Sequence, residues 1–199
     1  MKKYVFLTLF LTFIFTNVAN AGGVAIVGAN LGFQSLMADE DDSGIKQQAF
    51  MYGLTGKFFF GNEDKRTFGI GGTYNKATHE TGDFLKDYGI KDEWEFTTTS
   101  LDLMYNFGKD PDFLAYIIGS LGSIDIDAEV SANAGPLGNI NVDASATGTF
   151  WAIGVGGMTA KKGDFCFGGE VKYIGGDFAM GGTEDEGFIQ AYLTAGYAF

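Results

Sequence analysis

The chain ends in the stretch IQAYLTAGYAF, residues 189–199, in which apolar side chains alternate with small or polar ones. The odd positions from Ile189 to Phe199 are apolar, whereas Gln190 and Thr194 lie at even positions. Successive side chains of a strand point to opposite faces, so this stretch predicts a strand with one apolar and one polar or small face. Such a strand suits a membrane β-barrel, where one face meets lipid and the other faces the lumen.

The final residues Gly196-Tyr197-Ala198-Phe199 resemble the C-terminal targeting strand of bacterial outer-membrane β-barrels. In that family the last strand, ending in Phe, is read by the barrel-assembly machinery. The resemblance implies that Leu193, Tyr197 and Phe199 form the assembly signal and that the assembly machinery is a partner during biogenesis.

The N-terminal residues have the pattern of a secretory signal peptide. Lys2 and Lys3 precede an apolar stretch at residues 4–16, and Ala19 and Ala21 supply the small side chains that a signal peptidase reads. The alternative, an uncleaved helical anchor, needs about 20 apolar residues, and this stretch is shorter. We expect cleavage after residue 21.

The expected mature segment, residues 22–199, has the size of one domain. Glycine is frequent in the full chain, with 31 residues, but the 20 Phe and 9 Tyr of the full chain argue against disorder. The single cysteine, Cys166, excludes an intramolecular disulfide framework and a thiolate-rich metal site. We expect it to face the lumen as a small buried hydrophobe.

Alternation recurs along the mature chain in eight segments. They lie near residues 24–34, 49–60, 67–75, 100–107, 113–123, 151–156, 165–173 and 189–199. The segment at 113–123 is apolar at both parities, which leaves its facing open. Short polar turns at 61–65, 108–112 and 160–164 alternate with longer connections at 35–48, 76–95, 123–146 and 174–187.

This arrangement predicts an all-β, eight-stranded, antiparallel up-and-down transmembrane barrel with both termini on the periplasmic side. In pattern, the mature chain is similar to the group of small outer-membrane barrels that includes OmpA, OmpX and OmpW. A soluble lipocalin-like barrel is the alternative, but it needs an apolar lumen. The inward parity instead carries polar residues: Asn30, Lys57, Asn75, Asp102, Glu170, Lys172 and Gln190.

The net charge of −12 is concentrated in the four longer connections, which contain eighteen acidic residues and four lysines. An acidic surface repels nucleic acid, so we expect no nucleic-acid partner. The expected partners are outer-membrane lipid and lipopolysaccharide, with divalent cations as a further candidate. Solubility and mutual repulsion of the loops are the simpler explanation of the acidity.

Two acidic clusters are weak calcium candidates. Asp39 and Asp41 begin a stretch that resembles the first half of an EF-hand loop, although its twelfth position is Phe50 rather than a bidentate Glu. Asp125, Asp127 and Glu129 would share one face of an extended hairpin arm. The sequence supports no specific metal site beyond these clusters and no cofactor.

Four charged residues have the parity of the lumen: Lys57, Asp102, Glu170 and Lys172. An eight-stranded lumen is just wide enough for side chains to fill it, so these groups should meet. Unpaired buried charges are costly, which predicts a neutral salt-bridge network that plugs the barrel. In the alternative, Lys57 extends toward the periplasm and Lys172 pairs with Glu170 alone.

Enzyme chemistry is not expected. Acyl-chain hydrolysis or transfer needs a base, usually a histidine, beside an activated hydroxyl. The one histidine, His79, lies in a long connection and is expected to be a solvated loop residue. The chain lacks the His-x-Ser-Asn stretch of the lipid A deacylase family and the His/Ser/Asp set of the palmitoyltransferase family.

Three functions remain as hypotheses. The leading one is a non-enzymatic structural or surface-interaction protein whose acidic loops face the medium. The resemblance to OmpW-like proteins implies a second, a narrow conduit for small apolar compounds, for which inward glycines at 67–75 and 151–156 would leave room. The third and least favoured is a lipid A-modifying enzyme.

Overall fold

The computed structural model describes residues 23–37, 46–61, 66–80, 90–110, 112–133, 139–177 and 187–199. Eight antiparallel strands pair in chain order, and β8 returns to β1 to close the barrel, which confirms the predicted fold class. The strands are β1 (Val24–Leu36), β2 (Gln48–Phe60), β3 (Phe68–Glu80), β4 (Ile90–Asn106), β5 (Phe113–Asn133), β6 (Asn139–Thr159), β7 (Phe165–Asp177) and β8 (Phe188–Ala198). None of the described residues forms a helix long and apolar enough to cross a membrane.

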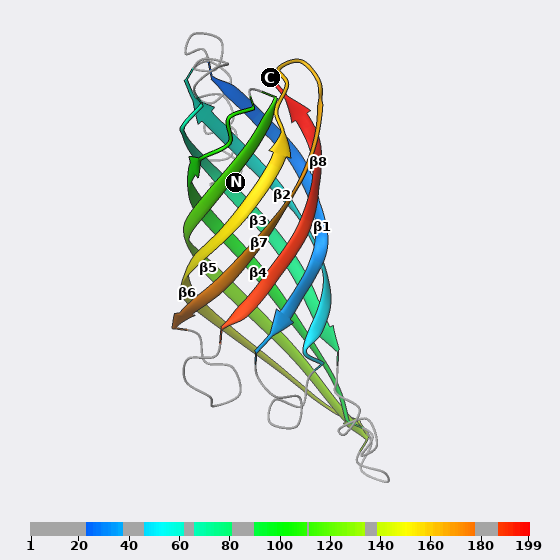
Figure 1. Ribbon diagram of the computed structural model, residues 1–199. Coiled ribbons are helices and arrows are strands. Elements are labelled where there is room, and N and C mark those ends of the chain that lie inside the picture. Colours follow the sequence, from blue (N-terminus) through cyan, green and yellow to red (C-terminus); the bar gives the residue numbers. More distant parts are fainter. Residues whose placement is uncertain are drawn as a thin grey trace, which may run out of the picture.

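The two ends of the barrel differ. At the end called here the turn end, short connections join β2 to β3, β4 to β5 and β6 to β7, and the C-terminus lies there (top of Figure 1). Gly61 and Gly163 have φ angles of 112° and 82°, which side chains rarely allow, so glycine is needed at these tight connections. Strands end and begin on either side of the three predicted short turns, as expected, although residues 62–65 and 111 of these turns lie outside the described residues.

The opposite end, called the arm end, carries an extension of three strands (bottom of Figure 1). We call this extension the arm; it comprises residues 90–98 of β4, 124–133 of β5 and 139–148 of β6. The sequence predicts long connections at 76–95 and 123–146, but β3, β4, β5 and β6 extend into these ranges, so the predicted strand ends are wrong. The alternation of apolar and polar residues is lost there because the outward positions of the arm are charged or polar, unlike those beside lipid.

The predicted facing of the strands is confirmed. Outward positions are apolar and exposed, such as Leu31 on β1 and Leu193 on β8, whereas Asn30 and Thr194 are buried. On β5, whose facing was open, the odd positions face outward and the even ones inward, because Leu121 is 69% exposed and Ile118 only 1%.

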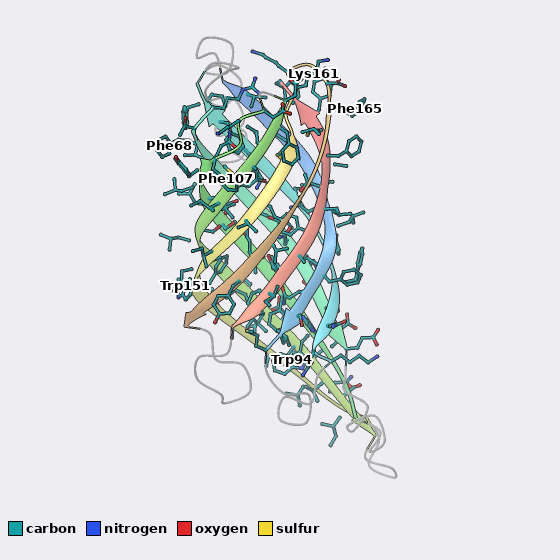
Figure 2. The ribbon with its side chains drawn as sticks, viewed as in Figure 1. Phe68, Trp94, Phe107, Trp151, Lys161 and Phe165 are labelled. Atoms are coloured by element: carbon teal, nitrogen blue, oxygen red, sulfur yellow. The ribbon has the colours of Figure 1, made fainter. Side chains whose placement is uncertain are left out.

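Outward aromatic residues lie toward both ends of the apolar wall. Phe68, Phe107 and Phe165 surround the turn end, and Trp151 lies nearer the arm end (Figure 2). Facing pairs reinforce these bands, including Phe165 with Tyr197 at 5.7 Å between ring centroids. Two aromatic bands that flank an apolar wall are characteristic of membrane barrels.

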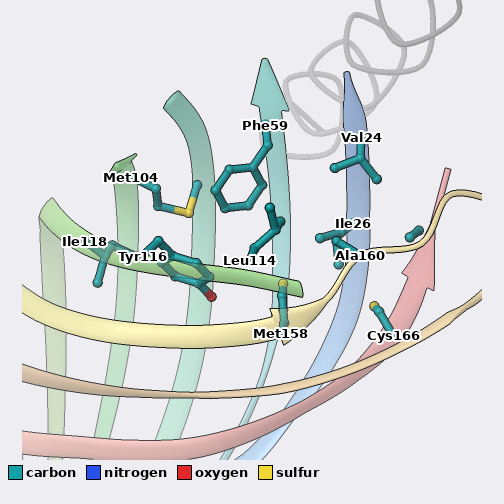
Figure 3. Packing of buried hydrophobic residues seen from close by; sticks show 11 residues of the cluster. Val24, Ile26, Phe59, Met104, Leu114, Tyr116, Ile118, Met158, Ala160 and Cys166 are labelled. Carbon is teal, nitrogen blue, oxygen red and sulfur yellow. The ribbon is translucent and has the colours of Figure 1, made fainter. Parts of the chain in front are cut away.

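Apolar side chains fill the lumen near both ends. At the turn end, Val24, Phe59, Leu114 and Met158 belong to one buried cluster together with Cys166, which faces inward as predicted (Figure 3). A second cluster at the arm end includes Phe96, Ile124, Phe150, Ile174 and Phe188. Polar and charged side chains occupy the lumen between these clusters.

Candidate functional site

The four predicted lumen charges come together in the middle of the barrel. The Lys57 ammonium donates to Oε1 of Glu170. The Lys172 ammonium lies 3.2 Å from Oδ1 of Asp102 and 3.5 Å from Oε2 of Glu170, so it bridges both carboxylates. Lys57 therefore pairs inside the lumen rather than extending past the turn end. Two positive and two negative charges make the network neutral.

Five hydroxyl groups complete this network. They are Thr73, Ser100 and Ser120 on Asp102, at 2.6, 2.8 and 2.6 Å, and Tyr116 and Tyr192 on Glu170, at 2.8 and 2.6 Å. A buried carboxylate is tolerated when donors satisfy its oxygens, and both carboxylates are satisfied here. The sequence alone does not single out these hydroxyls, although all five share the inward parity of their strands.

Inward glycines of β3 and β6 do not leave a passage, because neighbouring side chains occupy the space. A Cβ added at Gly156 would lie 2.6 Å from Cγ of Glu170 and 2.7 Å from the Tyr116 ring. A Cβ at Gly71 would lie 3.2 Å from Cγ of Lys57. These glycines accommodate the long side chains that cross a narrow lumen.

His79 is not a solvated loop residue, and that prediction is wrong. It lies in β3 at the arm end, faces inward and is 0% exposed. Its Nδ1 is 2.8 Å from the Lys46 carbonyl oxygen and its Nε2 is 3.2 Å from Nε2 of Gln34. The inward parity that His79 shares with Asn75 would have indicated this position.

The environment of His79 favours the neutral imidazole. The outward apolar residues of β3 end at Tyr74 and are followed by Lys76 and Glu80, so His79 lies beyond the apolar wall. Burial lowers the pKa of His79, and the hydrogen bond to the Lys46 carbonyl opposes this effect in part.

The outer face of the arm is acidic. Glu80 of β3, Glu93 of β4, Glu129 of β5 and Asp143 of β6 are consecutive cross-strand partners, so four carboxylates form one row. Directly opposed like charges repel. Two ion pairs lie at the edge of this face: Lys46 is 3.6 Å from Glu80, and Lys76 is 2.6 Å from Glu95.

The calcium candidates on the arm share a face, as the sequence suggests. Asp125, Asp127 and Glu129 alternate along β5 and are exposed. Oγ1 of Thr147 donates to Asp125 at 3.0 Å. Within the described part of the chain, no three metal-binding side chains come close enough to hold an ion. Calcium binding here stays a prediction.

Other predicted residues lie at the chain ends. Leu193, Tyr197 and Phe199 are on the outward parity of the last strand, and Phe199 forms two backbone hydrogen bonds with Ala25. The assembly role of these three residues stays a prediction. Asp39 and Asp41, like Ala19 and Ala21 of the cleavage site, lie outside the described residues.

Comparison with known proteins places the chain in a family. The family model for the outer membrane protein beta-barrel domain matches residues 6–199. The chain therefore belongs to the family of outer-membrane β-barrels and is an integral protein of that membrane. No curated protein matches the sequence.

Solved structures show the same barrel at low sequence identity. The attachment invasion locus protein Ail of Yersinia pestis is 14% identical, with a TM-score of 0.54, and the match covers 90% of this chain and 99% of that one. The N-terminal β-barrel domain of Pseudomonas aeruginosa OprF is 15% identical, with a TM-score of 0.41, covering 90% of this chain and 98% of that one. The match to Ail shows a shared fold, and at this sequence identity it shows no shared activity.

Proposed function

We propose that this barrel is a non-enzymatic surface-interaction protein whose acidic arm face binds cationic groups outside the cell. The observation that carries the proposal is the row of Glu80, Glu93, Glu129 and Asp143 on paired strands. Strand pairing fixes the backbone that carries these carboxylates, so less conformational freedom is lost when a partner binds than would be lost from an unpaired loop. A field of one sign attracts partners of the opposite sign and raises association rates.

The orientation in the membrane is part of the proposal. The turn end, where the described chain begins at residue 23 and ends at residue 199, faces the periplasm, and the arm faces the medium. Thr147→Cys on the arm and Lys161→Cys at the turn end test this orientation with a membrane-impermeant thiol reagent on intact cells. We expect labelling of Thr147→Cys only, because Lys161→Cys would lie in the periplasm, out of reach of the reagent. The native Cys166 is buried and should give no background labelling. The reverse pattern would place the arm in the periplasm.

The binding experiment uses the barrel in lipid nanodiscs and an immobilised oligolysine peptide. The arm variant combines Glu93→Gln, Glu129→Gln and Asp143→Asn. The matched control combines Asp110→Asn, Asp112→Asn and Asp164→Asn, which removes the same charge from the turn end. We expect the arm variant alone to weaken binding, by about tenfold or more at low salt, and the difference to shrink as salt rises. Equal binding by both variants would contradict the proposal.

A non-conducting barrel fits this role better than a conduit. The charge network and the two apolar clusters occupy successive levels of the lumen. We expect a planar bilayer that contains the protein to give no conductance steps. Regular steps would favour the conduit for small apolar compounds.

Both ring nitrogens of His79 already have partners in Gln34 and Lys46, which argues against a role as a general base. The lipid A mass spectrum of a strain that lacks the protein should therefore be unchanged. A change in acylation that the intact gene restores would instead identify an enzyme.

A further inference from the structure

A continuous chain of side-chain hydrogen bonds runs along the lumen toward the arm end. Oγ1 of Thr194 donates to Oδ1 of Asn30 at 2.9 Å, and Nδ2 of Asn30 donates to Oδ1 of Asn75 at 3.1 Å. Nδ2 of Asn75 donates to Oε1 of Gln190 at 3.2 Å, and Nε2 of Gln190 donates to Oε1 of Gln34 at 3.0 Å. Gln34 then meets His79, and His79 meets the Lys46 carbonyl. Every donor along this amide chain points toward the histidine.

The strand register explains how side chains on non-adjacent strands reach one another. Asn30 of β1 and Asn75 of β3 are both cross-strand partners of Gly53 in β2. A Cβ at Gly53 would lie 2.1 Å from Oδ1 of Asn75, so any larger residue would block the contact. Ala49 is the cross-strand partner of Gln34 and is the small β2 residue at the second crossing.

The direction of the amide chain is set at its arm end. A backbone carbonyl only accepts, so Nδ1 of His79 carries the proton that binds the Lys46 oxygen. In the neutral ring, Nε2 is then an acceptor and Gln34 must present its NH₂ group. Each amide that presents NH₂ toward the histidine leaves its oxygen for the preceding donor. One tautomer therefore orients four side-chain amides.

Protonation of His79 would conflict with this arrangement. The imidazolium donates from both nitrogens, so Nε2–H would face the NH₂ group of Gln34. A half-turn of the Gln34 amide removes the conflict but places its NH₂ against that of Gln190. Successive half-turns of Gln190, Asn75 and Asn30 restore the bonds between these amides, because the Thr194 hydroxyl is able to accept as well as donate. The Thr98 hydroxyl, which accepts from Nε2 of Gln190 at 3.3 Å, would then donate to Gln190 instead of to the Asn75 carbonyl.

The geometry points to a proton-operated device: uptake of one proton at Nε2 of His79 exchanges donor and acceptor in each side-chain hydrogen bond of the amide chain, as far as Thr194. It is independent of cationic-partner binding by the arm. Because every bond between the amides has a counterpart in the reversed state, the two orientations differ little in free energy, and one proton is able to select between them.

The charged groups of the neighbouring elements do not dictate the protonation of His79. They are Lys46 before β2, Lys76 and Glu80 of β3, and Glu93 and Glu95 of β4. The strand residues among them have the outward parity, and Lys46 and Glu80 form an exposed ion pair. On the inner side His79 contacts Gln34 of β1 and the ring of Phe96 on β4, which is 5.0 Å away. Titration of His79 therefore acts on the lumen mainly through Gln34.

Solution NMR of the barrel in detergent micelles tests the device. The pH titration follows the His79 ring and the side-chain amide resonances of Gln34, Gln190, Asn75 and Asn30. We expect the resonances of all four amides to shift with the same midpoint as the His79 ring, at a pH below the pKa of an ordinary histidine. Constant resonances at Asn75 and Asn30 while His79 titrates would overturn the proposal.

Two variants separate transmission from a general effect of pH. Gln34→Leu interrupts the amide chain: the His79 ring should still titrate, but Gln190, Asn75 and Asn30 should no longer respond. His79→Asn should abolish the titration of all four amides. Amides that still titrate in either variant would contradict the device. The wild-type titration alone suffices if a variant fails to fold.

Discussion

The lumen and the outer face of the arm share strands β4, β5 and β6 but handle charge in opposite ways. In the lumen, Asp102 and Glu170 are paired with lysines and hydroxyl groups. On the arm, Glu93 and Glu129 oppose each other directly across β4 and β5. Burial explains the difference, because an unpaired charge costs several kcal/mol in the lumen but little in water. Charge that the lumen must neutralise is available for interaction on the arm.

The largest expected effect is at Asp102. Asp102→Ala leaves Lys172 with Glu170 as its one remaining carboxylate partner and removes the acceptor of three hydroxyls. We expect the free energy of unfolding to fall by about 3–5 kcal/mol. Urea unfolding in micelles measures this change.

The matched change on the arm is Asp127→Ala, which should alter the free energy of unfolding by no more than about 0.5 kcal/mol. The double variant Asp102→Ala with Lys172→Met should recover much of the loss, because neither charge is then left without its partner. Equal effects of the two aspartate variants would mean that the lumen network does not stabilise the barrel.

A smaller effect is expected at the glycines. In Gly156→Ala, the new methyl group would collide with Glu170 and Tyr116, so we expect a loss of about 1–3 kcal/mol in the free energy of unfolding. Gly119 faces outward on β5 and has nothing within 4 Å of an added Cβ, so Gly119→Ala is the control and should be neutral or slightly stabilising. Thermal unfolding monitored by gel mobility compares the two. An unaffected Gly156→Ala would show that the lumen has spare room.

The smallest effect is expected on the arm. Glu129 has acidic partners on both sides, Glu93 and Asp143, so Glu129→Gln should raise the free energy of unfolding by about 0.2–1 kcal/mol. The gain should decrease at high salt because the repulsion is screened. Urea unfolding at two salt concentrations checks both statements. A stabilisation independent of salt would point to a cause other than repulsion.

Sequence reasoning predicted the barrel because lipid leaves a regular signal. One face of each membrane-spanning strand must be apolar, so Leu31, Leu54 and Leu103 reveal the facing of their strands. On β5 the signal is ambiguous, since Leu114 and Ile118 fill an apolar part of the lumen. Both faces of that strand are then apolar for different reasons.

A neutral network of lumen charges was predictable, because Lys57 and Asp102 share the inward parity and buried charges must be neutralised. Their hydroxyl partners were not, since contacts such as Thr73 with Asp102 depend on the register between strands. His79 was misplaced for a related reason. Beyond the membrane the outward face becomes polar, so a polar strand such as residues 76–80 of β3 looks like a loop.

The joint between β1 and β8 has a further consequence. Asn30 is paired with Thr194 and Gln34 with Gln190, and both pairs are hydrogen bonded through their side chains. A slip of this joint by two residues would keep every side chain on its proper face, so hydrophobicity alone tolerates it. The slip would nevertheless separate both pairs and leave Oδ1 of Asn30 and Oε1 of Gln34 without the donors they have in the native register. The two polar pairs therefore disfavour a misaligned closure of the first strand onto the last and select the correct register.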